Sequence, residues 1–357
     1  LAVTSLAMDP ADSDVIYAGT GEGIGNIDAL PGAGIFRSEN GGNSWIQLPG
    51  TPTSEAAFVN DIAHHPTESG QLIACVITVD ENGEIWRTTN DGDNWTVVAT
   101  TASRPTDVKY DPDNPDVVLV GTGSGAFRSI NAGMNFTVIS DGTEGNLPAN
   151  TGRCEFAFSA GTDAVFASCD VDRGVGAEQG QIWRSLDNGA TWEFRSELLH
   201  LSRQGWYNNV IWVVPGSLQT FMVGGVDLFV SFDGGETLEA ISNWTQYHTG
   251  LSAHADHHAI VPHANYGVGG NSQIYVGNDG GVQVAEDGVL TLPTQGWTNL
   301  ANNLGITQFY HADVTPDGGK ILGGSQDNDD LLYTTSGGSQ NWFQATTGDG
   351  TFCAIHP

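Results

Sequence analysis

The chain has 357 residues and a formal net charge of −31 at pH 7, although only 15% of its residues are charged. Its 48 glycines, 14 prolines and 10 tryptophans are typical of a globular, turn-rich protein with enough apolar residues for one large core. The negative charge argues against nucleic acids and anionic membrane surfaces as partners, because both would be repelled. No apolar run reaches the length of about 18 residues that a membrane-spanning helix needs, so we expect no membrane insertion.

One turn motif recurs along the chain. Its first copy places Ser38, Asn40, Gly42 and Trp45 between two short apolar segments. The Asn or Asp side chain of such a turn can accept backbone N–H groups, glycine takes a positive φ, and the aromatic residue closes the hairpin. Four further clear copies carry these residues at the same spacing: Asn90, Gly92 and Trp95; Asn131, Gly133 and Phe136; Asp187, Gly189 and Trp192; Asp233 and Gly235. We call residues 38–45, 88–95, 129–136, 185–192 and 231–238 the box turns.

The spacing of the motif predicts the fold class. Weaker copies begin at Ala285 and Thr334, and successive copies start 41 to 56 residues apart. A period of this length, built from short strands, predicts the four-stranded blades of an all-β propeller. The box turns resemble the Asp-box, or BNR, repeat of sialidase, sortilin and xyloglucanase-type propellers. That resemblance implies a propeller over the whole chain but no particular activity, because the repeat occurs in enzymes, receptors and assembly factors.

Each repeat reads as four strands, and the strand after a box turn completes the blade. In the first repeat we expect strands at 3–10, 15–19, 34–37 and 45–48. The predicted blades span residues 1–50, 58–100, 105–141, 153–196, 206–243, 256–300 and 307–346, within a single domain of residues 1–357. Residues 349–357 repeat the first strand of blade one, which predicts seven complete repeats plus the first strand of an eighth. This leaves either a seven-bladed ring with a tail or part of a longer parent, which we favour.

Two of the cysteines flank a predicted hairpin. Cys154 and Cys169 are placed so that the midpoint between them falls between Gly161 and Thr162. A symmetric hairpin would set the two cysteines directly opposite each other, where a disulfide can form. The alternative is that both are small buried apolar residues.

Polar loops gather at the blade edge opposite the box turns. In a four-stranded meander the loops after strands two and four share one edge, and the box turns lie at the other. Loops after second strands carry Asp172, Asp227, Asp279 and Asp327, and loops before first strands carry His254, Asp256, His257 and Asp349. We therefore expect carboxylates, imidazoles and aromatic rings to converge around the mouth of the central channel.

The second half of the chain carries a further resemblance. The segments Gln204–Tyr207, Gly224–Leu228, His254–His258, Asn278–Gly281, Gln326–Asn328 and Gly348–Gly350 follow one another in this order. Together they resemble large secreted bacterial propeller proteins described as sortilin-like or glycosyl-hydrolase-like. The resemblance covers residues 203–357 and implies a secreted, extracellular or cell-surface location. Because Leu1 reads as the middle of a strand, we expect any signal peptide to have been removed.

Metal binding is the first chemistry that these loops suggest. Asp256, His257, Asp279, Asp327 and Asp349 supply hard oxygens that suit calcium, and the imidazole would allow a transition metal instead. The sequence contains no EF-hand loop and no His-Glu-x-x-His pair. The alternative is that the Asp-Gly pairs only make turns and that His257 or His258 packs beneath them.

Glycoside hydrolysis is the second possibility, with Asp279 and Asp327 as the pair of carboxyl groups. Mutual repulsion between clustered carboxylates can keep a proton on one of them at neutral pH, as an acid catalyst requires. Trp206, Tyr207, Phe309 and Tyr310 could then stack on sugars, although for each of them a place in the core is the favoured reading. A sialidase is disfavoured, because it needs a cluster of arginines to hold the carboxylate of its substrate. Four arginines directly precede box turns and therefore face the opposite edge: Arg37, Arg87, Arg128 and Arg184. The Arg-Ile-Pro signature of sialidases is also absent.

Ligand binding without catalysis is the third possibility, and the one we favour. The acidic edge would prefer a basic or metal-bridged ligand. We expect a secreted propeller that binds a glycan, a protein or a peptide, with calcium as the candidate cofactor and a polysaccharide-degrading hydrolase as the alternative. The candidate ligand-binding residues are Trp206, Tyr207, Asp227, His254, Tyr310 and Gln326.

Overall fold

The structure is a computed structural model of the chain. It describes residues 2–25, 29–51, 56–149, 151–171, 179–301, 304, 307–338 and 342–356, so Asp172 lies outside the described residues. The chain divides into two compact units, Leu1–Ser242 (unit one) and Asn243–Pro357 (unit two). The single domain of residues 1–357 stays a prediction. None of the described helices is long and apolar enough to cross a membrane.

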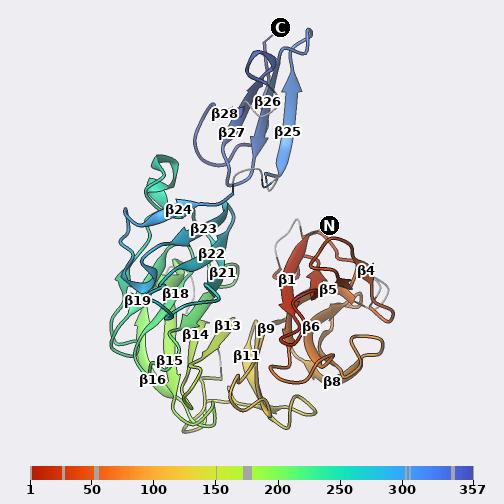
Figure 1. Ribbon diagram of the computed structural model, residues 1–357, viewed down its shortest axis with the longest axis vertical. Helices are drawn as coiled ribbons and strands as arrows, with labels where there is room; N and C mark the ends of the chain where they lie inside the picture. The colour runs from red at the N-terminus through yellow and green to blue at the C-terminus, as the bar shows by residue number, and fades with distance from the viewer. Residues whose placement is uncertain are drawn as a thin grey trace. The chain divides into compact units, whose positions relative to one another are not determined.

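Unit one contains five four-stranded antiparallel sheets, and in each sheet the strands lie in chain order. The strands, labelled in Figure 1, are β1 to β4 (Val3–Met8, Val15–Thr20, Ile35–Glu39, Ile46–Gln47), β5 to β8 (Ala56–His64, Leu72–Thr78, Gly83–Thr88, Thr96–Thr101), β9 to β12 (Pro105–Tyr110, Val117–Thr122, Gly125–Ile130, Thr137–Val138), β13 to β16 (Cys154–Phe158, Val165–Val171, Gln179–Ser185, Glu193–Leu198) and β17 to β20 (Val210–Val213, Phe221–Gly224, Leu228–Ser231, Glu239–Ala240).

Unit two contains two more sheets of the same order. They are β21 to β24 (His257–Pro262, Ile274–Asn278, Gly281–Ala285, Trp297–Asn299) and β25 to β28 (Phe309–Val314, Lys320–Ser325, Asp330–Thr334, Trp342–Gln344). Figure 1 shows β25 to β28 lying side by side as one sheet. Seven four-stranded meanders confirm the predicted all-β class and a β-propeller of seven blades. The described helices are four short 3₁₀ turns, η1 (Leu199–Leu201), η2 (Trp244–Thr249), η3 (Gly288–Leu290) and η4 (Thr335–Gly337).

The core lies between the faces of neighbouring blades. Every residue of β10 is buried, and β6 is buried except at its last residue, because each of these second strands is covered on both faces. Ile73 of blade two packs in one cluster with Val108 and Val118 of blade three. Each fully buried aliphatic side chain of this kind stabilises the fold by about 1.5–3 kcal/mol.

The box turns share one set of hydrogen bonds. In the third copy the Ser129 hydroxyl accepts the backbone N–H of Gly133 at 3.0 Å and donates to the Asn131 side chain at 2.8 Å. Asn131 in turn accepts the backbone N–H of Asn135 at 3.1 Å. The same three contacts recur in the other four box turns. The two weaker copies differ, because η3 and η4 follow β23 and β27 there.

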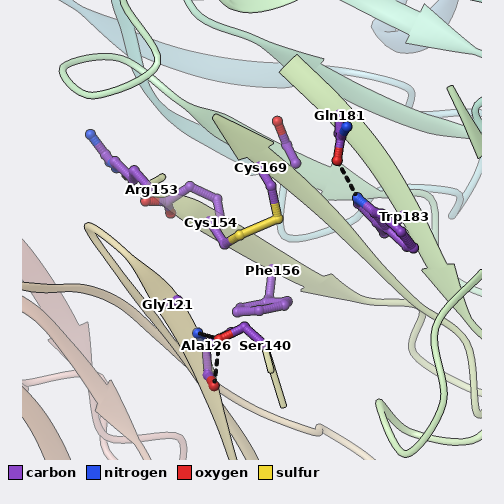
Figure 2. Close-up of a disulfide and its surroundings, with 12 residues drawn as sticks. Gly121, Ala126, Ser140, Arg153, Cys154, Phe156, Cys169, Gln181 and Trp183 are labelled. Atoms are coloured by element: carbon purple, nitrogen blue, oxygen red, sulfur yellow. Dashed lines mark hydrogen bonds and ion pairs between the residues drawn. A yellow bond between two sulfur atoms is a disulfide. The ribbon is translucent and has the colours of Figure 1, made fainter. Parts of the chain in front are cut away.

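A disulfide lies in blade four. Cys154 and Cys169 are directly opposite each other in the β13–β14 pair, both are fully buried, and their sulfur atoms are joined (Figure 2). Phe156 packs beside them in a cluster that includes Ala126 of blade three. The structure therefore has the bridged arrangement rather than the alternative of two free thiols. Cys75 and Cys353 are free.

The first strands of neighbouring blades are joined by an aspartate. Asp61 of blade two accepts the backbone N–H of Val108 at 3.0 Å, and Asp107 of blade three accepts that of Phe156 at 2.8 Å. In blade seven, Asp313 accepts the N–H of Ile355 at 2.8 Å. Residues 349–356 form no strand in the structure, but they contact blade seven through the same bond that a following first strand makes.

Candidate functional site

Three carboxylates of unit two lie together. Asp256 directly precedes β21, Asp279 lies in the turn between β22 and β23, and Asp327 lies in the turn between β26 and β27. One carboxylate oxygen of each residue lies within 4.8 Å of the other two. We call these three residues the carboxylate cluster. It lies at the sheet edge opposite the turns after the third strands, and it contains three of the five residues predicted as metal ligands.

Local backbone conformation places these carboxylates. Asp256 and Asp327 have φ values of 63° and 57°, in the left-handed region, where Asp is more readily accommodated than most residues with a side chain. Gly280, next to Asp279, lies against His254: a Cβ at this position would be 2.4 Å from the Cγ atom of the imidazole. The turn that carries Asp279 therefore requires glycine after the aspartate.

Hydrogen bonds connect the turns of blades six and seven. The His254 Nε2 atom lies 2.9 Å from the carbonyl oxygen of Asp327, and the Asn328 side chain donates to the carbonyl oxygen of Asp279 at 3.1 Å. Both bonds use backbone acceptors, so they fix the turns and leave the carboxylates to face one another. His254, predicted from the sequence as a ligand-binding residue, thus contacts the turn that carries Asp327, and its role in ligand binding stays a prediction.

The electrostatics of the cluster centre on Asp327. Burial, and after it the negative charges of Asp279, Asp349 and Asp256, raise the pKa of Asp327 to about 7. Two unit charges about 4 Å apart repel by about 4 kcal/mol at an effective dielectric constant of about 20, which is enough to retain a proton. Asp349 also accepts the backbone N–H of Asp327 at 3.0 Å, which places this fourth predicted ligand beside the cluster.

The two neighbouring histidines have different environments. His258 lies 3.0 Å from Asp279, measured from Nε2 to Oδ1, and its side chain is 35% exposed. His257, the predicted metal ligand, is fully buried, its Nδ1 atom lies 3.4 Å from the Asn278 amide, and burial lowers its pKa to about 3. Of these two imidazoles, that of His258 therefore contacts a carboxylate of the cluster, although the sequence suggested His258 only as a packing residue.

The other predicted ligand-binding residues divide between the two units. In unit two, the Tyr310 hydroxyl donates to the Gln326 side chain at 2.7 Å. In unit one, Trp206 is 49% exposed, with its ring 5.7 Å from that of Tyr207, and Asp227 accepts the Ser242 hydroxyl at 2.7 Å. Gln326 and Tyr310 thus lie next to the turn that carries Asp327.

Comparisons with known proteins give the fold. No family model and no curated protein matches the chain. Among solved structures, a GH74 xyloglucanase from Xanthomonas campestris matches at a TM-score of 0.64 and 15% identity, over 92% of this chain and 51% of that one. A GH74 enzyme from Niastella koreensis matches at 0.64 and 17%, over 93% and 52%. An ancestral GH74 enzyme matches at 0.61 and 17%, over 92% and 47%.

The chain thus spans about half the length of these solved structures. At such low identities the likeness shows a shared β-propeller fold and nothing of the chemistry. Any activity of this chain has to be argued from its own residues.

Proposed function

We propose that this chain is a ligand-binding β-propeller, in which the carboxylate cluster of blades six and seven holds a divalent cation that bridges to a glycan or a protein. The observation that carries the proposal is the convergence of Asp256, Asp279 and Asp327 within 4.8 Å. Three carboxylates at this separation are favourable only when a proton or a cation offsets their repulsion. Oxygen donors of this kind suit calcium best.

The first experiment tests the cation. Calcium is titrated calorimetrically into chelator-treated protein, and into Asp256→Asn and Asp279→Asn. We expect each variant to weaken binding at least about tenfold, because even partners outside the coordination sphere contribute about 10–100-fold. Asp287→Asn is the matched control, because Asp287 is exposed and makes no capping bond with its side chain. Calcium binding that is equal in all four proteins would rule out the cluster as its site.

Glycoside hydrolysis is the second candidate function, and the pKa of Asp327, raised to about 7, favours it. Protonated Asp327 would donate its proton to the glycosidic oxygen as the C–O bond breaks, while the Asp279 carboxylate attacks the anomeric carbon. Water would then hydrolyse the glycosyl-enzyme. The GH74 neighbours include a xyloglucanase, which makes plant polysaccharides a reasonable substrate to test.

The separation of the two carboxyl groups favours one type of hydrolase. Inverting enzymes need about 6.5–9.5 Å between the carboxyl groups to admit water, whereas retaining enzymes use about 5–5.5 Å. One oxygen of each carboxyl group lies within 4.8 Å of the other, which favours the shorter separation. Release of reducing ends from polysaccharides by the wild type, lost in Asp279→Ala, would identify a hydrolase; we then expect retention of anomeric configuration. If the protein binds a glycan but releases no reducing ends from it, the result supports the binding function.

Two further features belong to this proposal. We assign the box turns to the Asp-box repeat, because the Ser/Thr-x-Asn/Asp hydrogen bonds recur in all five copies. We also assign the protein to the secreted, sortilin-like bacterial propellers, which its acidity and its resemblance in residues 203–357 support. Secretion is tested by expressing the native gene in its host and fractionating the culture.

A further inference from the structure

A hollow in unit two adjoins the carboxylate cluster. Its volume of about 400 Å³ falls in the range of about 300–1,000 Å³ that is usual for small-ligand sites. Side chains from η2, the strand β24, the β26–β27 turn and β28 line it: Tyr247, His248, Asn299, Asn328, Asp329 and Gln344. None of these six residues was among the candidate site residues predicted from the sequence. We call this hollow the amide pocket, because three of the six side chains are amides.

The polar groups of the amide pocket are held in fixed positions. Asp329 is 7% exposed, with a φ of 67°, and its two oxygens accept the Gln344 amide at 2.8 Å and the Gly348 backbone N–H at 2.9 Å. The His248 Nδ1 atom lies 3.5 Å from the same carboxylate. A buried carboxylate beside one ring nitrogen helps to orient the imidazole.

The aromatic part of the pocket is also fixed. The Tyr247 ring meets the His254 ring edge to face, with centroids 4.5 Å apart, and its hydroxyl bonds to the Asn299 side chain. One face of a tyrosine ring, combined with amides and a carboxylate, is a surface on which a sugar can pack its C–H groups while its hydroxyls bond to the polar groups.

We propose that the amide pocket binds one neutral sugar residue of a glycan. Each sugar hydroxyl can donate and accept at once, which matches a lining that offers both amide donors and carboxylate or carbonyl acceptors. Among the lining residues, Leu331 and Tyr247 have the large apolar side chains, and most of the others carry an amide, a carboxylate, an imidazole or a hydroxyl group. The inference rests on the proposed ligand-binding function and names the class of its ligand.

The amide pocket is physically connected to the carboxylate cluster. Asn328 lines the pocket, and its amide donates to the carbonyl oxygen of Asp279. Asp327 belongs to the cluster and Asp329 to the pocket, so one turn supplies residues to both. A cation that orders this turn reduces the conformational entropy that is lost when the sugar binds. The two ligands then bind with positive coupling. Calcium should raise the affinity for glycan.

The experiment is a calorimetric titration of the whole chain with short cello-, xylo- and mannooligosaccharides, with calcium and with chelator. His248→Ala and Gln344→Ala should each weaken binding about two- to tenfold, because each removes one hydrogen-bond partner of the sugar. His248→Gln, which keeps a planar polar group, should weaken it less. Gln246→Ala is the matched control, because Gln246 lies on the same 3₁₀ turn, η2, outside the pocket lining.

Three results would overturn the inference. They are no binding of any of these oligosaccharides, binding that His248→Ala and Gln344→Ala leave unchanged, and binding of a mixed peptide library that these two variants abolish. The calcium titration distinguishes this failure from failure of the proposed function. If calcium binds, Asp279→Asn weakens its binding and no sugar binds, only the assignment of the pocket is wrong. If sugar binds and calcium does not, the assignment of the pocket is supported and the proposed cation site is wrong.

Discussion

The carboxylate of Asp313 accepts a hydrogen bond from the backbone N–H of Ile355 at 2.8 Å. This bond has the same form as those from Asp61 to Val108 and from Asp107 to Phe156, each of which joins the first strands of two neighbouring blades. The bond to Ile355 also lowers the pKa of Asp313. It anchors residues 349–356 on blade seven.

Removing this anchor should loosen the segment. In Asp313→Ala we expect the Ile355 amide to exchange its hydrogen about tenfold faster, because one hydrogen bond is worth about 0.5–1.5 kcal/mol. Hydrogen exchange followed by mass spectrometry measures this. Asp317→Ala is the control, since among the described residues Asp317 accepts hydrogen bonds within its own turn, from Thr315 and Gly319. Equal exchange of Ile355 in both variants would contradict the anchoring role.

Asp327→Asn should stabilise the protein at high pH. The folded-state pKa of Asp327, about 7, is above its ordinary value of 3.8, so the folded chain binds more protons between these two pH values. Stability from this group is therefore lost as pH rises from about 4 to 7. The melting temperature of Asp327→Asn in chelator should match the wild type near pH 4 and exceed it above pH 7. A difference that does not change with pH would refute the raised pKa.

Calcium affinity should depend on pH for the same reason. Binding to the cluster must displace the proton of Asp327, so we expect the affinity to fall about tenfold per pH unit below pH 7 and to level off above it. Asp327→Asn should bind calcium more weakly but lose most of this dependence. Titrations at several pH values with constant ionic strength measure it, and a wild-type affinity that is flat across pH 6 to 8 would contradict it.

Gly121→Ala should destabilise the fold much more than Gly277→Ala. Both glycines are the next-to-last residue of a second strand, but a Cβ at Gly121 would lie 1.8 Å from the Cys154 carbonyl oxygen of the next blade. A Cβ at Gly277 would lie 3.5 Å from the Ala259 side chain, an ordinary contact. We expect a loss of about 1–3 kcal/mol or more for the first substitution from overpacking and little for the second. Urea unfolding of both variants tests this.

The Cys154–Cys169 bridge should be present in the oxidised protein. With a separation of 15 residues, it is expected to stabilise the fold by about 3 kcal/mol. Alkylation after denaturation should modify only Cys75 and Cys353 before reduction, and all 4 cysteines afterwards. The double variant Cys154→Ala/Cys169→Ala should lower the free energy of unfolding by about 2–4 kcal/mol. Four reactive thiols before reduction would show that the bridge does not form.

Much of the fold could be predicted from local patterns. The box turns depend on residues within one segment, such as Ser129 and Asn131, so their hydrogen bonds are fixed by the sequence wherever the chain places them. The pairing of Cys154 with Cys169 followed from the symmetry of one hairpin. The weaker copies at 285–288 and 334–338 lacked this complete residue set, and 3₁₀ turns occur there instead.

The sequence by itself determined the strands, the seven repeats and the edge of each blade at which carboxylates gather. These follow from the spacing of the repeated motif and from the reversal of chain direction at every turn of a four-stranded meander. Only the tertiary structure decided that His258 rather than His257 contacts Asp279, since a register shift between His257 and Ala259 interrupts the alternation of faces. It also decided that Asp329 orients His248, because that contact depends on how distant turns pack, which no local pattern encodes.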